Sequence, residues 1–279
     1  MEFYKHPWDK WVGINGLNFH YLDWGGTSDR PLVWLHGMNG NSHHWEFFAR
    51  NACNDFRIYG LDMRGHGDSD HAKEGYALAK YILDIAEFAK TLGLEKFDLG
   101  GMSLGGRNAI GYAGMYPETI KHLILVDIGP EMPKRGSKDL NKRVLSPPLG
   151  FRSEEEAMEY YRQRMPRASE EILRHRVEHG LRLNWADKLV FKHDPDLVWS
   201  TGSAGKKEIP FVWECLSKIT CPVLVLRGAE SDLLSPEIAK RMMDVLPNGK
   251  YVEIPDSNHY IAEENPAAFE HEVRRFLEK

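Results

Sequence analysis

Short apolar runs alternate with longer amphipathic segments along most of the chain, and this alternation predicts the fold. The continuous apolar runs at 31–35 and 222–226 are typical of strands that are buried on both faces, and so is the run at 120–128, which is apolar apart from Lys121, His122 and the Asp127 near its end. Apolar residues recur at helical spacing over 76–92 and 266–277, which predicts amphipathic helices there. Strands that alternate with helices in this way predict an α/β fold with a mostly parallel sheet covered on both faces.

Shorter elements complete this pattern. Two alternating runs at 12–15 and 17–24 meet around Gly16, which predicts an antiparallel hairpin. Further strands are predicted at 56–61, 97–99 and 250–254, and further helices at 42–48, 104–113 and 236–246. All of these elements lie outside the central part of the chain.

The pattern changes after Pro130. Residues 131–209 are rich in charge and predict helices but no strong strand. The clearest predicted helices span 154–165 and 169–178, and Ser169 is a suitable residue to begin the second. We therefore expect a core built from 1–130 and 210–279, with 131–209 inserted as a helical cap. A cap at this position would cover the carboxyl ends of the strands, where sheets of this kind bind ligands.

Composition narrows the possible classes of function. Of 279 residues, 42% are hydrophobic and 28% charged, which is ordinary for a soluble globular protein. A net charge of -5 argues against nucleic acid as a partner. The three cysteines lack CxxC spacing, so we expect neither a disulfide framework nor a zinc site. There is no signal-peptide pattern and no apolar run near the ~20 residues of a membrane span. We expect a cytoplasmic monomer or homodimer that acts on a small molecule, away from membranes.

The candidate chemistry centres on Ser103. The stretch 101–105 reads Gly-x-Ser-x-Gly, and it joins a predicted strand to a predicted helix. A sharp turn of this kind holds the serine in a strained conformation, and side chains two residues before or after it would collide, so Gly101 and Gly105 fit the pattern. The functional interpretation is a nucleophile exposed above the sheet. The alternative is an ordinary strand–helix turn.

A serine becomes a nucleophile when a histidine takes its proton and a carboxylate orients that histidine. His259 directly follows the last predicted strand, so we predict it to be the base. The expected chain order is nucleophile, acid, histidine. We favour Asp232, in the loop after the penultimate strand. Asp127 ends the strand that follows the predicted helix 104–113, and it is either the acid or a buried carboxylate that fixes the start of the cap. Glu230 is a third choice.

Attack on a carbonyl would form an oxyanion, which two backbone N–H groups should bind. We predict the amides of Leu104 and Met38 for this role. His36 is expected to order its own turn rather than act as a second base. We expect no metal site, because the neighbouring His43 and His44 would not share a helix face. The residues predicted to line the substrate pocket are His36, Gly37, Asn39, Met102 and Tyr260.

Together these landmarks resemble the α/β-hydrolase family. The resemblance covers nearly the whole chain apart from the cap, and it rests on five segments in the right order. They are the Gly-x-Ser-x-Gly turn at 101–105, His36-Gly37, the loop 62–69 (Asp-Met-Arg-Gly-His-Gly-Asp-Ser), the loop 228–232 and His259. The resemblance implies an eight-stranded sheet and a Ser103-Asp232-His259 triad that needs no cofactor. The stretch 126–130 before a helical cap is similar to carboxylesterases, lactonases and carbon–carbon bond hydrolases. Relatives that dehalogenate alkanes or open epoxides carry aspartate at the position of Ser103.

One subgroup of the family bears on the choice of acid. Relatives that hydrolyse an acetamidomethylene-succinate place the acid at the position matching Asp127 and hold substrate carboxylates with cap arginines. Arg143 and Arg164 are available for that task in this chain, or they are solvated cap residues. The first hypothesis is an esterase-type hydrolase that acts on an ester or lactone. The alternatives are cleavage of an amide or carbon–carbon bond with the same residues, and a receptor that binds ligand without catalysis.

Overall fold

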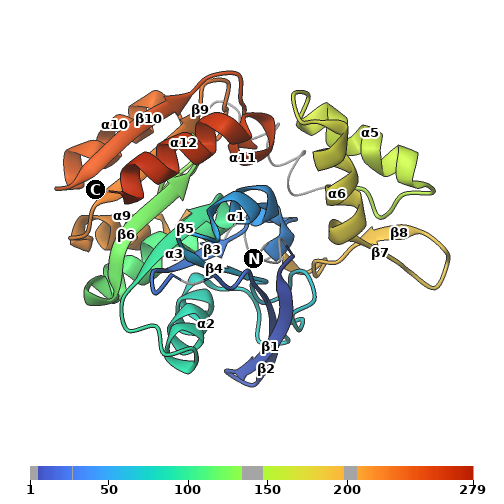
Figure 1. Cartoon of the computed structure of the whole chain (residues 1–279), viewed down its shortest axis with the longest axis horizontal. Helices are drawn as coiled ribbons and strands as arrows, with labels where there is room; N and C mark the ends of the chain where they lie inside the picture. The colour runs from blue at the N-terminus through green and yellow to red at the C-terminus, as the bar shows by residue number, and fades with distance from the viewer. Residues whose placement is uncertain (1–5, 27, 134–146, 198–205, 279) are drawn as a thin grey trace.

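The computed structural model describes residues 6–26, 28–133, 147–197 and 206–278. In this part of the chain an eight-stranded sheet has the order β1-β2-β4-β3-β5-β6-β9-β10 (Figure 1). β1 and β2 pair antiparallel, as does β2 with β4, and the remaining neighbours are parallel. The predicted fold class and hairpin are confirmed. The strands are β1 (Trp8–Ile14), β2 (Leu17–Asp23), β3 (Pro31–Leu35), β4 (Arg57–Leu61), β5 (Phe97–Met102), β6 (Ile120–Val126), β9 (Val223–Gly228) and β10 (Gly249–Ile254).

Helices cover both faces of the sheet, as the continuous apolar runs require. In β3, Val33 and Leu35 pack into the larger core cluster, whereas Leu32 and Trp34 pack into the cluster on the opposite face. The larger cluster is completed by α2 (Leu78–Thr91), α3 (Leu104–Met115), α9 (Ile209–Lys218) and α10 (Pro236–Val245). The other face is covered by α1 (Glu46–Ala52), α11 (Ile261–Glu264) and α12 (Pro266–Leu277). Short 3-10 turns span η1 (Ser42–Trp45) and η2 (Pro117–Thr119).

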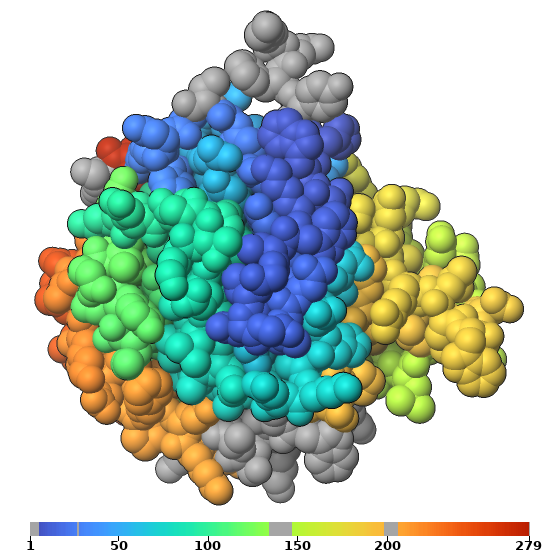
Figure 2. Space-filling model, turned by 90° about the horizontal axis from the view of Figure 1, so that it is seen from below, coloured from blue at the N-terminus to red at the C-terminus, as the bar shows by residue number. Residues whose placement is uncertain are grey.

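The described part of the predicted cap, residues 147–197, lies beside the sheet (Figure 1) and projects from the rest of the surface in the space-filling view (Figure 2); we call these residues the cap. It contains α5 (Glu154–Arg164) and α6 (Glu170–Gly180). The hydroxyl of Ser169 accepts a hydrogen bond from the amide of Ile172, which confirms the predicted start of α6. These helices share a small apolar cluster of their own with the segment that follows them.

The cap, where we expect no strong strand, contains two short ones. β7 (Leu181–Leu183) and β8 (Leu189–Phe191) pair as an antiparallel hairpin. In its turn, the side chain of Asn184 accepts hydrogen bonds from the amides of Ala186 and Lys188. Each strand has three residues, too few for an alternating pattern to be recognised. No described helix is both long and apolar enough to cross a membrane.

Candidate active site

Ser103 lies at the sharp turn between β5 and α3, with φ 51° and ψ -118°. A positive φ is uncommon for a residue with a side chain, so the backbone is strained here. The two glycines explain how the turn closes. A Cβ at Gly101 would lie 2.5 Å from the carbonyl carbon of Gly105, and a Cβ at Gly105 would lie 2.5 Å from the carbonyl oxygen of His36. The predicted steric reason for the Gly-x-Ser-x-Gly pattern therefore holds.

His259 follows β10 and lines the same pocket as Ser103. Its Nδ1 lies 2.7 Å from Oδ2 of Asp127, the residue directly after β6. Asp127 has no exposed surface and also adopts a positive φ, 49°. The fold thus brings together a serine, a histidine and a carboxylate from the ends of three different strands.

The preference for Asp232 as the partner of His259 is wrong. The loop after β9 supports Asp127 instead: the hydroxyl of Ser231 donates to Oδ2 of Asp127, and the amide of Gly228 donates to Oδ1 at 3.2 Å. The guanidinium of Arg227 fixes this loop, because it donates to the carbonyls of Ser231 and Leu234.

The two remaining acidic candidates of this loop lie elsewhere. Asp232 lines a different hollow, together with Arg227, Glu131 and Arg241. Glu230, the third choice, forms an ion pair with Arg167 at 2.6 Å. Neither carboxylate therefore takes the position beside His259 that Asp127 occupies.

Of the two predicted oxyanion donors, Leu104 directly follows Ser103 in the chain and Met38 lines the same pocket. Leu104 is the first residue of α3, so its amide is at the positive end of the helix. Met38 lies in a turn closed by a hydrogen bond from the amide of Gly40 to the carbonyl of Gly37, 3.0 Å long, with Asn39 at φ 61°. Met38 lines the pocket next to Ser103. That these two amides bind an oxyanion stays a prediction.

His36 orders this turn, as predicted, but its predicted place among the substrate-binding residues is wrong. It is fully buried and does not line the pocket. Nε2 accepts a hydrogen bond from the amide of Met63 at 3.1 Å, and Nδ1 lies 2.8 Å from the carbonyl oxygen of Gly37. Burial lowers the pKa of His36, which keeps the ring neutral. Both nitrogens are therefore used within the protein.

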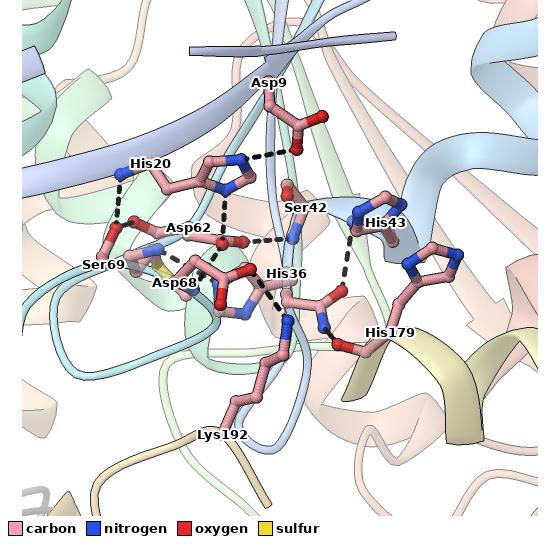
Figure 3. A network of polar contacts seen from close by, with 12 residues as sticks. Asp9, His20, His36, Ser42, His43, Asp62, Asp68, Ser69, His179 and Lys192 are labelled. Atoms are coloured by element: carbon pink, nitrogen blue, oxygen red, sulfur yellow. Dashed lines mark hydrogen bonds and ion pairs between the residues drawn. The ribbon is translucent and has the colours of Figure 1, made fainter. Parts of the chain in front are cut away.

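Below this turn, a buried network centred on Asp62 holds the loop 62–69 (Figure 3). Asp62 accepts hydrogen bonds from the amides of Ser42 and Asp68, at 2.5 and 2.9 Å, and from Nδ1 of His20 at 2.8 Å. Burial alone would raise the pKa of Asp62, but the hydrogen bond with His20 holds it below its usual range. The same hydrogen bond raises the pKa of His20 against the opposing effect of burial. The ion pair between His20 and Asp62 fixes the loop in which the amide of Met63 donates to His36.

The pocket is lined by core and cap together. Four of the five predicted lining residues are present: Gly37, Asn39, Met102 and Tyr260. The cap contributes Tyr160, Tyr161, Arg164, Arg176 and Phe191. The guanidinium carbon of Arg164 lies 3.5 Å from the centre of the Tyr160 ring. Arg143, the other predicted cap arginine, lies outside the described residues.

Sequence analysis missed two polar residues of the pocket wall, His44 and Arg176. Nη2 of Arg176 lies 2.7 Å from Oε1 of the buried Glu263, which in turn lies 3.3 Å from Nδ1 of His44. Burial, and next the charge of Arg176, lower the pKa of His44 well below its usual value. Nε of Arg176 and both ring nitrogens of His44 have no hydrogen-bond partner among the described residues. No local motif marks either residue, since the fold alone brings α6 to η1.

Comparisons with known proteins agree with this fold. A family model described as alpha/beta hydrolase fold matches residues 30–198. The 3-hydroxybutyrate-oligomer hydrolase of Cupriavidus necator is 28% identical over 265 residues, covering 89% of this chain and 88% of that protein. The 2-(acetamidomethylene)succinate hydrolase of Mesorhizobium japonicum is 25% identical over 247 residues, covering 88% and 87%. A crystal structure of E-2-(acetamidomethylene)succinate hydrolase superposes with a TM-score of 0.89 at 25% identity, covering 98% of this chain and all of the other.

Proposed function

The chain belongs to the α/β-hydrolase fold family, and we propose that it is a cofactor-independent serine hydrolase that cleaves a carboxylic ester of a small molecule. The observation that carries this proposal is the convergence at one pocket of Ser103, on its strained turn, with His259 and its 2.7 Å contact to Asp127. Two relatives carry esterase in their names, a bifunctional esterase/perhydrolase of Acinetobacter calcoaceticus and a putative esterase/lipase of Haemophilus influenzae, which is consistent with the proposal.

In this mechanism the hydroxyl of Ser103 attacks the carbonyl carbon while Nε2 of His259 takes its proton. The carboxylate of Asp127 holds the imidazole with Nδ1 protonated and stabilises the imidazolium that forms. The amides of Met38 and Leu104 bind the oxyanion of the tetrahedral intermediate. His259 then protonates the leaving group, and an acyl-enzyme remains on Ser103. Water, activated by the same histidine, releases the acid product.

Release of nitrophenol from 4-nitrophenyl acetate tests this proposal. We expect turnover by the wild-type protein and its loss in Ser103→Ala, with an unchanged circular dichroism spectrum. Full activity of Ser103→Ala would contradict the assignment of the nucleophile. If the wild-type protein binds short acyl compounds but turns none over, the receptor hypothesis is favoured instead.

A second candidate substrate class, a small molecule that carries a carboxylate, is favoured by the pocket wall. Arg164 and Arg176 line the pocket, and Nε of Arg176 has no hydrogen-bond partner among the described residues. A guanidinium binds a carboxylate through charge-assisted, often bidentate, hydrogen bonds. The relatives named for 2-(acetamidomethylene)succinate act on a dicarboxylate with an amide-type bond. Attack by Ser103 on the amide carbonyl of such a substrate would follow the same steps as attack on an ester.

Two esters of equal acyl length test this class: mono(4-nitrophenyl) glutarate, which carries a carboxylate, and 4-nitrophenyl 5-oxohexanoate, which carries a neutral ketone. We expect a preference for the glutarate in kcat/KM, and Arg176→Met should reduce this preference about 10- to 100-fold, as one charge-assisted interaction is worth ~1.5–3 kcal/mol. Arg174→Met is the matched control, because Arg174 lies on the same helix but is exposed. Equal rates for the two esters, unaltered by Arg176→Met, would exclude the class.

A further inference from the structure

We propose that the protein binds Zn²⁺ or a similar divalent metal ion where the cap contacts the rest of the chain, through His43, Glu46, His175 and His179. This site does not depend on the proposed function. His43 and Glu46 come from η1 and the start of α1 in the core, and the two other histidines come from α6 in the cap. The sequence argument that His43 and His44 do not share a face holds, because His44 lines the active-site pocket. His43 instead meets residues more than a hundred positions away.

The donor atoms of these four residues already lie close together. One ligand atom from each lies within 4.8 Å of all the others. Nδ1 of His43 is 2.7 Å and Nε2 of His175 is 2.9 Å from the same carboxylate oxygen, Oε2 of Glu46. The rings of His43 and His179 are stacked, with centroids 3.7 Å apart. Figure 3 shows these two side chains next to each other. Small rotations of these side chains would direct four ligand atoms at one point.

The donor set selects the class of ion. Three imidazoles and one carboxylate match the nitrogen and oxygen ligands that Zn²⁺ accepts in tetrahedral sites, at about 2.0–2.2 Å. Imidazole ligands favour Zn²⁺, Ni²⁺ or Cu²⁺, whereas Mg²⁺ and Ca²⁺ prefer oxygen ligands alone. His175 and His179 are four residues apart on α6, so their side chains lie on one helix face.

Neighbouring residues hold the ligands in place. Arg50 pairs with the second oxygen of Glu46, leaving Oε2 to the histidines. Asn41 accepts from the amide of His43 and donates to the carbonyl of His179, which ties the two backbone segments together. Partners of this kind orient the ligands in metal sites.

An ion can reach this cluster, and its binding would have a structural consequence. The side chains of His43 and His175 are partly exposed, at 16% and 10%. A bound ion would connect α6 to α1 directly. Because α6 also carries Arg176, the ion would fix one wall of the active-site pocket. At a free zinc concentration of about 100 times Kd, openings of α6 that break the site should become about 100-fold rarer.

Titration with zinc chloride tests the proposal on the full chain. The protein is stripped with EDTA, dialysed and titrated by calorimetry, and the bound metal is counted by elemental analysis. We expect one zinc ion per chain, a higher Tm, and slower amide exchange over 170–180. His43→Ala and His179→Ala should each weaken binding by more than about 100-fold, since loss of an outer-shell partner alone costs 10- to 100-fold. His271→Ala, at an exposed position on α12, is the control and should bind as the wild-type protein does.

Two results would overturn the proposal. One is the absence of stoichiometric zinc binding by the wild-type protein at micromolar concentrations. The other is binding that persists unchanged in both His43→Ala and His179→Ala, which would place the ion elsewhere, for example at the second cluster of His20, Asp62 and Asp68. Circular dichroism of each variant checks that it is folded, and His43→Gln provides a less disruptive replacement if His43→Ala is not.

Discussion

Replacing Asp127 with asparagine tests which carboxylate orients His259. Asparagine is the suitable replacement because it tolerates the left-handed backbone better than most residues, and Asp127 has φ 49°. In the native protein Oδ2 accepts hydrogen bonds from His259 and Ser231, and Oδ1 accepts from the amide of Gly228. An amide side chain offers one acceptor oxygen where the carboxylate offers two.

Both orientations of the new side chain are unfavourable. If its oxygen faces His259, its NH₂ group meets the amide of Gly228, and a buried donor is left without a partner at a cost of about 1–3 kcal/mol. If its NH₂ group faces His259, Nδ1 must become an acceptor, and Nε2 then carries the proton and cannot take one from Ser103. We therefore expect kcat to fall about 10⁴-fold, or about 5 kcal/mol of transition-state stabilisation.

The assay is steady-state hydrolysis of 4-nitrophenyl acetate by Asp127→Asn and Asp232→Asn, with urea unfolding of each variant as a check on stability. Asp232→Asn should stay within about threefold of the wild-type kcat, because Asp232 is exposed and lines a different hollow. Its stability should change by no more than about 0.5 kcal/mol. A loss in Asp232→Asn as large as that in Asp127→Asn would refute the reasoning. So would more than a tenth of wild-type activity in Asp127→Asn.

Three further predictions follow from the surroundings of the site. Ser231→Ala removes a hydrogen bond to the Asp127 carboxylate, so kcat should fall about 10- to 100-fold with little change in KM, since such a bond is worth ~1.5–3 kcal/mol. An unchanged kcat would contradict a supporting role for Ser231. Gly105→Ala places a Cβ 2.5 Å from the carbonyl oxygen of His36, so the variant should lose both activity and several degrees in Tm; a fully stable variant would show that the turn can relax. The pKa of Asp62 in the folded protein lies below its unfolded value of about 3.8. The charged Asp62 therefore stabilises the fold fully above about pH 3.8, and this stabilisation is lost as the pH falls through the folded pKa. The urea midpoint should therefore drop more between pH 5 and pH 3 in the wild-type protein than in Asp62→Asn, and equal drops would argue against a charged Asp62.

The fold and the sharp turn at Ser103 could be predicted because each is encoded by a short stretch of sequence. The apolar run of β3 and the glycines around Ser103 each encode a structure within a few residues. The choice between Asp127 and Asp232 could not be made this way, since both follow strands that end at the same edge of the sheet. It is decided by the path of the loop after β9, which Arg227 holds so that Ser231 faces Asp127.

The cap was the least predictable part, because its packing depends on contacts between distant segments. Three-residue strands carry too little pattern to be detected, so β7 and β8 were missed. Arg176 and His44 come together from different elements, and no spacing in the sequence relates them. His175 and His179 do have the spacing of a ligand pair, but their partners His43 and Glu46 belong to the core.

Covalent labelling with a fluorophosphonate tests the central claim most directly, because this reagent reacts with a serine that a neighbouring base has activated. The wild-type protein should gain the mass of one adduct, and peptide mapping should place it on Ser103. Ser103→Ala should remain unlabelled, and Asp127→Asn should react far more slowly than Asp232→Asn. An adduct on another residue, or equal labelling of Ser103→Ala, would contradict the account.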